Sequence, residues 1–523
     1  MRREEQISSL ENHSSSLWDV VIIGGGATGA GLALDASSRG YKTLLLEKGD
    51  FSHGTSSRST KLVHGGVRYL AQGDLLLVIE ALRERGIMLK NAPHLTSDQQ
   101  FIIPVYTWFD MLLYTVGLKF YDLLAGRLSL GQSYFIGRKK TMERLPNLNG
   151  YGLKGGVVYH DGQFDDARMT LELIRKACEL GGTTLNYLTV KDLTKDNKGN
   201  VSGVSALDLI SGRSFKIRAR TVINATGVFA DDIIRMDNPL AKPILKPSQG
   251  IHLVLDSSFL GGSSAIMIPK TTDGRVLFAI PWYGKVVAGT TDTPLDEISS
   301  EPKALEKEIS FILETAGKYL KKAPARKDVL SLFAGLRPLA SDPSNPHSTK
   351  EISRRHKIIV SRSGLITITG GKWTTYRRMA AETLERAIGE KFLEKRECRT
   401  EKLILDDFSG GCLLPHFKIY GSHSQEIEKL IAGNNKLLRT IHPEFPYTVA
   451  EIMWICRNEM AATVEDVLAR RTRALFLDSR ASAEAAPEIA RIMADEFGYN
   501  EEWQKEQVNS YIKLAENYKI AVN

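Results

Sequence analysis

The segment "DVVIIGGGATGAGLALDASSRGYKTLLLE", residues 19–47, decides the fold of this 523-residue chain. It opens with an almost entirely apolar run that ends in three glycines, which is typical of a central parallel strand. Residues 27–40 then predict a helix that closes on Gly40, and residues 42–47 predict the next parallel strand. The segment therefore indicates one βαβ unit of an α/β protein.

Gly24, Gly26 and Gly29 form the pattern G-x-G-x-x-G where the predicted strand gives way to the predicted helix. The first glycine permits a tight turn, the second lets the backbone approach a pyrophosphate at the helix N-terminus, and the third lets helix and strand pack closely. Glu47 ends the second strand, where a carboxylate can bind a ribose diol and disfavours the 2′-phosphate of NADP. The pattern predicts a dinucleotide site that suits NAD or FAD.

Three further segments favour FAD over NAD. "GTSSRSTKLVHGG", residues 54–66, follows the second strand at once, where an NAD enzyme usually continues with a helix. "VINATG", residues 222–227, predicts a late strand whose end can pass close to the pyrophosphate. "ITGGKWTTYR", residues 368–377, predicts a glycine turn that leads into a helix, whose N-terminus favours the anionic edge of a reduced flavin.

Composition and charge limit the classes of function. Hydrophobic residues make up 42% of the chain and charged residues 25%, as in an ordinary globular protein of two or three domains. The net charge of +8 suits an anionic substrate or an acidic lipid surface, and no nucleic-acid module accompanies it. The four cysteines are far apart, which argues against a metal or disulfide framework and favours a reducing compartment. The polar N-terminus is not typical of a secretory signal.

The longest apolar stretch is "FIIPVYTWFDMLLYTVGLKFYDLLAG", residues 101–126. Pro104, Asp110, Lys119 and Asp122 interrupt it, so it falls short of a membrane-spanning helix. Its pattern allows a buried core segment or an amphipathic surface element, and we favour the buried core.

The remaining sequence predicts two more units. Residues 183–227 hold short β-rich runs, and residues 244–339 mix strands with one amphipathic helix after Ser300. We expect an α/β (α+β) protein in which a FAD-binding Rossmann-like domain is interleaved with a mixed-sheet substrate domain, followed by a C-terminal helical domain. The expected bounds are 17–75, 160–245 and 345–395 for the FAD-binding domain, 76–159 and 246–344 for the substrate or cap domain, and 400–523 for the helical domain.

Within the helical part, "TVEDVLARRTRALF", residues 463–476, opens with Thr463 and Asp466 in a capping-box arrangement. Its three arginines are expected to form a solvated or ion-paired helix face, with a contact to anionic lipid or to a second subunit as the alternative.

Several long motifs resemble the FAD-dependent glycerol-3-phosphate dehydrogenase family, of the aerobic, quinone-linked type. Residues 23–40 resemble the N-terminal signature of that family, and "GGKWTTYRRMA", residues 370–380, resembles its second signature. The resemblance runs from about Trp18 to Ala387 and extends more loosely to the helical tail. Further matching segments are "KLVHGGVRYL" (61–70), "GTTDTP" (289–294) and "AGLRPL" (334–339).

The resemblance implies oxidation of sn-glycerol 3-phosphate to dihydroxyacetone phosphate, with hydride transfer from substrate C2 to N5 of FAD. It also implies that electrons pass to a membrane quinone (ubiquinone or menaquinone), and that the protein is cytoplasmic and peripherally attached to the inner face of the cell membrane. The oxidase branch of the family passes electrons to oxygen instead; the lack of a long insertion favours the dehydrogenase. A homodimer is compatible with the sequence, and no metal site is expected.

A phosphate monoester substrate calls for arginines, which bind phosphate through two parallel hydrogen bonds and stay charged. The resemblance places five residues at the substrate: Arg68, Tyr69, Arg337, Arg354 and Lys372. It also places Lys372 close to the flavin, where its charge would stabilise the anionic reduced ring.

Two histidines are candidates for the base that accepts the hydroxyl proton. His64 is the first choice, because it lies on the segment expected to face the cofactor and its ordinary pKa is near neutral pH. His252, on a predicted strand of the substrate domain, is the alternative. Arg337 can polarise the alcohol oxygen, but it is a poor base because it stays protonated.

The residues expected to contact the cofactor come from all of these glycine-rich segments. They are Gly24, Gly26, Ala27, Thr28, Gly29, Glu47, Lys48, Thr55, Ser56, Ser57, Lys61, Leu62, His64, Gly65, Gly66, Val190, Ala225, Thr226, Gly227, Gly371, Lys372, Thr374 and Thr375.

Two other functions stay open at this point. A flavin amine oxidase that acts on a small amino acid shares the expected fold and would need an arginine for a carboxylate. A flavin-binding protein without catalytic activity is the other alternative, although retention of His64, Arg68, Arg337 and Lys372 together argues against it.

Overall fold

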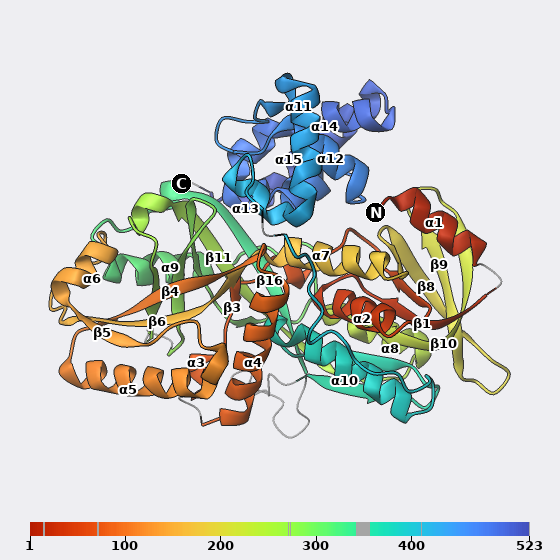
Figure 1. Ribbon diagram of the computed structural model, residues 1–523, viewed down its shortest axis with the longest axis horizontal. Helices are drawn as coiled ribbons and strands as arrows, with labels where there is room; N and C mark the ends of the chain where they lie inside the picture. The colour runs from red at the N-terminus through yellow and green to blue at the C-terminus, as the bar shows by residue number, and fades with distance from the viewer. Residues whose placement is uncertain are drawn as a thin grey trace.

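The computed structural model describes residues 1–13, 16–70, 73–269, 271, 274–340, 356–408 and 410–521, without the side chains of Arg68 and Ala340. Figure 1 shows two lobes, each built on a β-sheet, with a helical domain above them. This arrangement confirms the expected fold class.

The first sheet is the core of the cofactor lobe and confirms the predicted βαβ unit. Its main path is β17 (Lys357–Val360), β18 (Ile366–Thr369), β10 (Ser214–Asn224), β1 (Leu17–Ile23), β2 (Thr43–Leu46) and β7 (Thr183–Leu185). All neighbours from β18 to β7 are parallel. Two antiparallel strands, β8 (Leu188–Lys195) and β9 (Val201–Asp208), extend the sheet from β10.

Both faces of this sheet are covered. On one face lie α2 (Ala27–Ser38), α7 (Asp166–Glu179) and α10 (Tyr376–Gly389), whose apolar residues form one core with β1 and β2. On the other face, residues of β8 and β9 pack against β1 and β10 in a second core. The near-continuous apolar sequence of β1 follows from this burial on both sides.

The second sheet forms the substrate lobe. Its path is β15 (Thr293–Pro294), β11 (Leu245–Asp256), β14 (Lys285–Gly289), β13 (Leu277–Trp282), β12 (Ala265–Ile268), β4 (Thr96–Val105), β6 (Gly155–Phe164) and β3 (Leu62–Val63), while β16 (Val329–Ala340) pairs with β11 and β5 (Tyr134–Gly137) with β6. β3 therefore belongs to this sheet although it lies inside the expected segment 17–75. β6 spans the expected boundary at residue 160, because the chain crosses between the lobes along these strands.

The other helices surround these two sheets and build the helical domain. Outside the helical domain they are α1 (Arg3–Asn12), α3 (Val67–Leu70), α4 (Leu75–Asn91), α5 (Trp108–Ala125), α6 (Arg138–Arg144), α8 (Ala230–Asp237) and α9 (Glu306–Tyr319). The helical domain holds α11 (Ser424–Gly433), α12 (Val449–Asn458), α13 (Ala474–Leu477), α14 (Ser479–Phe497) and α15 (Glu501–Ala515). α9 is the amphipathic helix expected after Ser300, with Ile309 and Ile312 buried.

The preference for a buried core over residues 101–126 is wrong for most of that stretch. Residues 101–105 do form a buried part of β4, but α5 buries only Leu118, Tyr121 and Ala125. Its outer face is exposed because only one stripe of the helix packs on the lobe. Within the described ranges, every helix is too short or too polar to span a bilayer.

The arginines of the 463–476 motif are ion-paired, which was one of the two expected states, but they are buried and form no solvated face. Thr463 and Asp466 form the expected reciprocal caps, with the Asp466 amide donating to Thr463 Oγ1 (3.2 Å) and the Thr463 amide to Asp466 Oδ2 (3.1 Å). A wide π-type turn over Asp466–Arg471 then directs the side chains of Arg470 and Arg471 onto Asp50 of the cofactor lobe. These ion pairs anchor the helical domain.

Candidate active site

The larger of two adjoining cavities, about 620 Å³, opens at the carboxyl ends of β1, β2 and β10. Ligands of open parallel sheets bind at this edge, and the volume lies within the range of about 300–1,000 Å³ found for ligand pockets. At its floor a Cβ on Gly24 would stand 2.7 Å from the Ala225 carbonyl oxygen, and a Cβ on Gly29 would overlap the Gly24 carbonyl oxygen. The turn between β1 and α2 therefore requires glycines, as the fingerprint predicts.

Glu47 holds this turn in place. Its carboxylate accepts hydrogen bonds from the backbone amides of Gly25 (2.6 Å) and Gly49 (2.8 Å). A carboxylate has about four acceptor sites, so two remain for the ribose hydroxyls that the sequence assigns to it. Gly227, at the end of β10, also lines the cavity, and among the described residues no heavy atom lies within 4 Å of its ideal Cβ position. The residues present fit a dinucleotide cofactor.

Most of the residues expected to contact the cofactor line one of the two cavities. Fourteen line the larger cavity: Gly24, Gly26, Ala27, Thr28, Glu47, Lys48, Thr55, Ser56, Val190, Ala225, Thr226, Gly227, Gly371 and Lys372. Leu62, His64, Gly66 and Thr374 line the smaller one. Gly29, Ser57, Lys61, Gly65 and Thr375 are in the wall of neither cavity.

Lys61 is turned into the protein interior. Its fully buried ammonium donates to the Ser57 carbonyl oxygen (2.6 Å) and to Asp166 Oδ2 (2.8 Å). Arg473 of the helical domain donates to the other oxygen of the same carboxylate (3.0 Å). Burial lowers the pKa of Lys61 to about 7, against the opposing charge of Asp166. We therefore correct its expected role: in this structure Lys61 joins the cofactor lobe to the helical domain.

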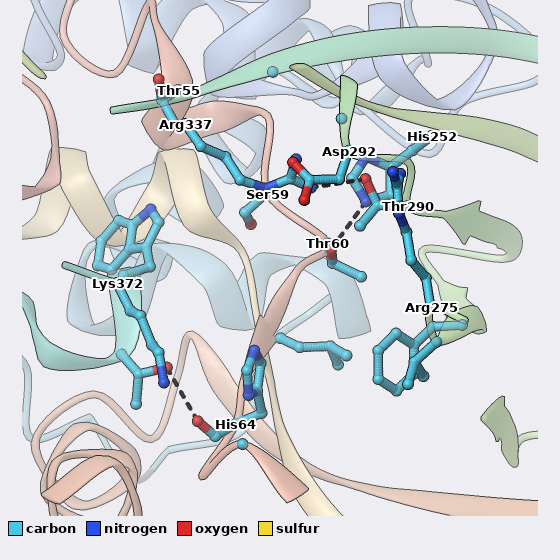
Figure 2. A pocket seen from close by; sticks show the side chains of 18 of the residues that line it. Thr55, Ser59, Thr60, His64, His252, Arg275, Thr290, Asp292, Arg337 and Lys372 are labelled. Carbon is cyan, nitrogen blue, oxygen red and sulfur yellow. Dashed lines mark hydrogen bonds and ion pairs between the residues drawn. The ribbon is translucent and has the colours of Figure 1, made fainter. Parts of the chain in front are cut away.

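The smaller cavity, about 300 Å³, lies against the larger one. Thr55, Arg58, Leu336, Pro338, Gly370, Gly371, Lys372 and Trp373 line both. Figure 2 shows that Lys372 and His64 enter the smaller cavity from one side, and Arg337, Asp292 and Arg275 from the other. The ammonium of Lys372 lies 3.7 Å from the centre of the Tyr69 ring, so both of these predicted substrate residues share one end of the cavity.

Arg337 is fixed by groups from one segment. Its guanidinium donates to Asp292 Oδ1 (3.2 Å), Thr290 Oγ1 (3.2 Å) and the Thr291 carbonyl oxygen (2.9 Å). Asp292 in turn accepts a hydrogen bond from Ser248. The strand pairing of β16 with β11 brings Arg337 opposite Ser248, which explains why these distant residues meet.

The two candidate histidines both line the smaller cavity but differ in surroundings. His252 is buried in β11, its Nε2 lies 2.9 Å from Thr60 Oγ1, and its ring stacks on Phe333. Burial, with the charges of Lys61 and Arg337, holds its pKa well below 6.5. His64 lies in the turn between β3 and α3, where its carbonyl oxygen accepts a hydrogen bond from Thr374 (3.4 Å).

A buried carboxylate supports the turn that carries His64. Asp161 of β6 accepts hydrogen bonds from the Gly65 amide (3.3 Å), from Arg85 Nη1 (2.8 Å) and from the Tyr121 hydroxyl (3.0 Å). A Cβ on Gly65 would overlap this Tyr121 hydroxyl. Asp161 was not expected from the sequence, because its partners come from α4 and α5 and only the folded chain brings them together.

Other wall residues were also missed by sequence reasoning. Arg275, Thr60 and Thr290 line the smaller cavity. Thr290 lies in the quoted segment 289–294 and Thr60 in 54–66, so proximity to those motifs was an available signal. The side chain of Arg68 and the whole of Arg354 lie outside the described residues, so their expected roles stay predictions.

One cluster has the composition of a metal site. His53, Glu301 and Glu465 place ligand atoms within 4.8 Å of one another at the meeting point of the three domains. Both carboxylates already bind arginines, Glu301 to Arg58 and Glu465 to Arg470. The cluster is therefore an ion-pair junction between the domains.

Comparisons with known proteins agree with this geometry. The sequence matches the family model of FAD-dependent oxidoreductases over residues 19–377 and the model of the C-terminal domain of alpha-glycerophosphate oxidase over residues 366–504. A probable mitochondrial glycerol-3-phosphate dehydrogenase of Caenorhabditis elegans is 41% identical over an alignment that covers 94% of this chain and 72% of the relative. The mitochondrial glycerol-3-phosphate dehydrogenase of Homo sapiens is 40% identical, with 98% of this chain and 75% of the relative covered.

A solved structure shares the whole architecture. The glycerol-3-phosphate dehydrogenase from Bacillus halodurans complexed with FAD superposes with a TM-score of 0.78 at 30% identity, and both chains are covered completely. The family model of FAD-dependent oxidoreductases and the solved structure with bound FAD agree on the cofactor, and the glycine-lined cavity fits a dinucleotide. The chain therefore belongs to the family of FAD-dependent glycerol-3-phosphate dehydrogenases, and its cofactor is FAD.

Proposed function

We propose that this chain oxidises sn-glycerol 3-phosphate to dihydroxyacetone phosphate. The observation that carries the proposal is the small cavity of about 300 Å³, with Arg337 and Lys372 in its wall, which adjoins the cofactor cavity. Its size and cations suit a three-carbon phosphate ester, and the named activities of the relatives point to the same substrate.

Bound FAD supplies the acceptor for the hydride that leaves substrate C2. In our proposal His64 accepts the hydroxyl proton. His252 is the weaker candidate, since its Nε2 is engaged by Thr60 and its ring is held against Phe333. Because the pKa of His252 lies far below 6.5, it stays neutral near pH 7 and adds no charge to the cavity wall.

Arg337 binds the substrate oxygens and polarises the alcohol, since Asp292 and Thr290 fix its guanidinium in the cavity wall. Lys372 holds a positive charge at the junction of the two cavities, where it would stabilise the negative charge of the reduced flavin ring. Arg68 and Arg354 complete the proposed phosphate site.

The substrate is tested by product analysis. Purified FAD-loaded protein, sn-glycerol 3-phosphate and an artificial electron acceptor should form one dihydroxyacetone phosphate for every two electrons accepted. Turnover of a small amino acid, with none of the phosphate ester, would replace this proposal with an amine oxidase.

We further propose that the electrons pass to a membrane quinone at the inner face of the cell membrane. The relatives are named dehydrogenases rather than oxidases, which supports an acceptor other than oxygen. Rapid reduction of a short-chain ubiquinone or menaquinone analogue, with little hydrogen peroxide formed under air, is the expected result. Peroxide formed at the rate of substrate oxidation would assign an oxidase.

An exposed apolar surface supports peripheral membrane contact. Along α5 and the adjoining start of α4, large apolar side chains are each at least 41% exposed: Trp108, Phe109, Leu112, Leu113, Val116, Phe120, Leu123, Leu75, Leu76 and Ile79. These two helices lie together at the lower edge of the substrate lobe (Figure 1). Lys119 of α5 and Arg127 just after it are exposed and can contact anionic lipid headgroups.

Flotation with vesicles tests this contact. The protein should float with vesicles rich in phosphatidylglycerol, and Leu112→Glu together with Val116→Glu should abolish flotation. Leu209→Glu with Ile210→Glu, an exposed apolar pair at the β9 end of the cofactor lobe, is the control. Equal flotation of both double variants would place the membrane surface elsewhere.

A further inference from the structure

Three arginines line the described wall of the smaller cavity: Arg58, Arg275 and Arg337. Arg58 forms an ion pair with Glu301, and Arg337 forms one with Asp292 at 3.2 Å. The third, Arg275, was not among the residues expected from the sequence.

Arg275 stands just before β13, and Thr271 holds its backbone. Its amide donates to Thr271 Oγ1 (3.0 Å), and the Thr271 hydroxyl donates to the Arg275 carbonyl oxygen (2.9 Å). The next residues along the chain, Val276 and Phe278, line the cavity as well. Figure 2 shows the Arg275 side chain extending along the cavity toward Thr290, on the side of the cavity that carries Arg337.

The charges at the Arg337 end of the cavity show why a second arginine would help to bind a phosphate there. A phosphate monoester carries close to two negative charges at neutral pH, while the Arg337–Asp292 pair is neutral as a unit. His252 is neutral near pH 7, because burial and the charges of Lys61 and Arg337 hold its pKa well below 6.5. Asp161, at the other end, is matched by Arg85. Arg275 lines the Arg337 end, where its guanidinium can bind a phosphate together with Arg337 and add to the proposed contacts of Arg68 and Arg354.

We propose that Arg275 binds the phosphate group of the substrate and sets the preference of the enzyme for phosphate esters over uncharged polyols. The inference rests on the proposed oxidation of sn-glycerol 3-phosphate. In this assignment Arg337 contacts both the alcohol oxygen and the phosphate. Arg275 contacts the phosphate and not the alcohol. A guanidinium suits this position because its planar fork donates two parallel hydrogen bonds to phosphate oxygens.

Kinetics of Arg275→Gln test the proposal. Loss of one charged hydrogen-bonded contact should raise KM for sn-glycerol 3-phosphate about ten- to a hundredfold, while kcat at saturation stays within about twofold. Arg275→Lys keeps the charge but loses the fork, so its KM should fall between those of the wild type and Arg275→Gln. The matched control is Arg83→Gln, an exposed arginine of α4 paired with Glu401, which should leave both constants unchanged.

The outcomes separate this inference from the function on which it rests. If the wild type does not oxidise sn-glycerol 3-phosphate, the proposed function fails. If the wild type is active and Arg275→Gln keeps its KM, or loses kcat with KM unchanged, the assignment of Arg275 is overturned. The FAD content and the thermal midpoint of each variant are measured beside the kinetics. If Arg275→Gln does not fold, Arg275→Lys is used instead. A wild-type KM in Arg275→Lys would contradict recognition of the phosphate by the planar guanidinium.

Discussion

Arg337 and His252 show how single residues of the smaller cavity acquire their roles from neighbours. Asp292, Thr290 and Thr291 orient the guanidinium of Arg337, so that it is presented to the cavity in one position. Thr60 and Phe333 hold His252 in the wall in its neutral form. His64, in the turn that Asp161 supports, is left as the base in our account.

The two histidines should therefore respond differently to substitution. His64→Gln should lower kcat by about a hundred- to ten-thousandfold and remove the acidic limb of the pH profile of kcat, because the proton acceptor is lost. His252→Gln should change kcat much less and leave that limb in place. Stopped-flow reduction across pH measures both. Loss of the limb only in His252→Gln would assign the base to His252.

Lys61 makes the stability of the protein rise with pH, which is opposite to the effect of a lysine whose pKa is raised by folding. Its folded pKa of about 7 lies below the ordinary 10.5, so the unfolded chain binds the proton more strongly. The resulting destabilisation is complete below about pH 7 and disappears as pH rises to 10.5, so this group makes stability rise with pH. Thermal midpoints of the wild type should fall relative to those of Lys61→Met as pH is lowered from 10 to 7. A constant difference between the two proteins would contradict this assignment.

At the scale of elements, α5 has two unlike faces. Its outer face carries the exposed apolar side chains, and on its inner face Tyr121 reaches Asp161 and Gly65. The helix therefore supports the turn that carries His64, while its outer face is the surface for which we propose membrane contact.

Tyr121→Phe tests the inner face. It keeps the ring but removes the hydroxyl that donates to Asp161, which should cost about 1–3 kcal/mol of stability and raise KM by loosening the His64 turn. The FAD content should not change. Tyr114→Phe, on the same helix, is the control. An unchanged KM in Tyr121→Phe would show that the turn does not depend on this bond.

The sequence predicted the elements whose patterns are local, and it missed those that depend on distant partners. The βαβ unit around β1 was predictable because a double-sided apolar strand and a G-x-G-x-x-G turn have few alternatives. The exposed face of α5 was missed because the sequence pattern of an apolar helix does not show whether solvent or protein covers it. Asp161 and Arg275 were missed because no local pattern says which cavity a side chain will line.

On the scale of the whole molecule, a buried charge cluster ties the helical domain to the cofactor lobe. Arg471 donates to both oxygens of Asp50, one of them at 2.9 Å, and Arg470 donates to the same carboxylate (2.6 Å). Burial alone would raise the pKa of Asp50, but the two arginines outweigh it and lower the pKa to about 2. The anchor therefore depends on an ionised Asp50.

Removal of one partner should loosen the domain. Arg471→Met leaves Asp50 buried with one arginine fewer, and the expected loss is about 3–5 kcal/mol of stability, measured by chemical denaturation. In the wild type, the stability that Asp50 contributes is present above pH 3.8 and is lost as pH falls toward 2. Limited proteolysis should release the helical domain from Arg471→Met first. Cleavage at the wild-type rate would contradict its role as the anchor.

The central claim is that the cofactor accepts electrons from a phosphate ester bound in the adjoining small cavity. Its most direct test is the visible absorbance of bound FAD after anaerobic mixing with sn-glycerol 3-phosphate, with glycerol and with glycine in parallel. Our account predicts rapid, complete bleaching with sn-glycerol 3-phosphate and little or none with the other two. Oxidised flavin that persists with sn-glycerol 3-phosphate, or bleaches with glycine instead, would contradict it.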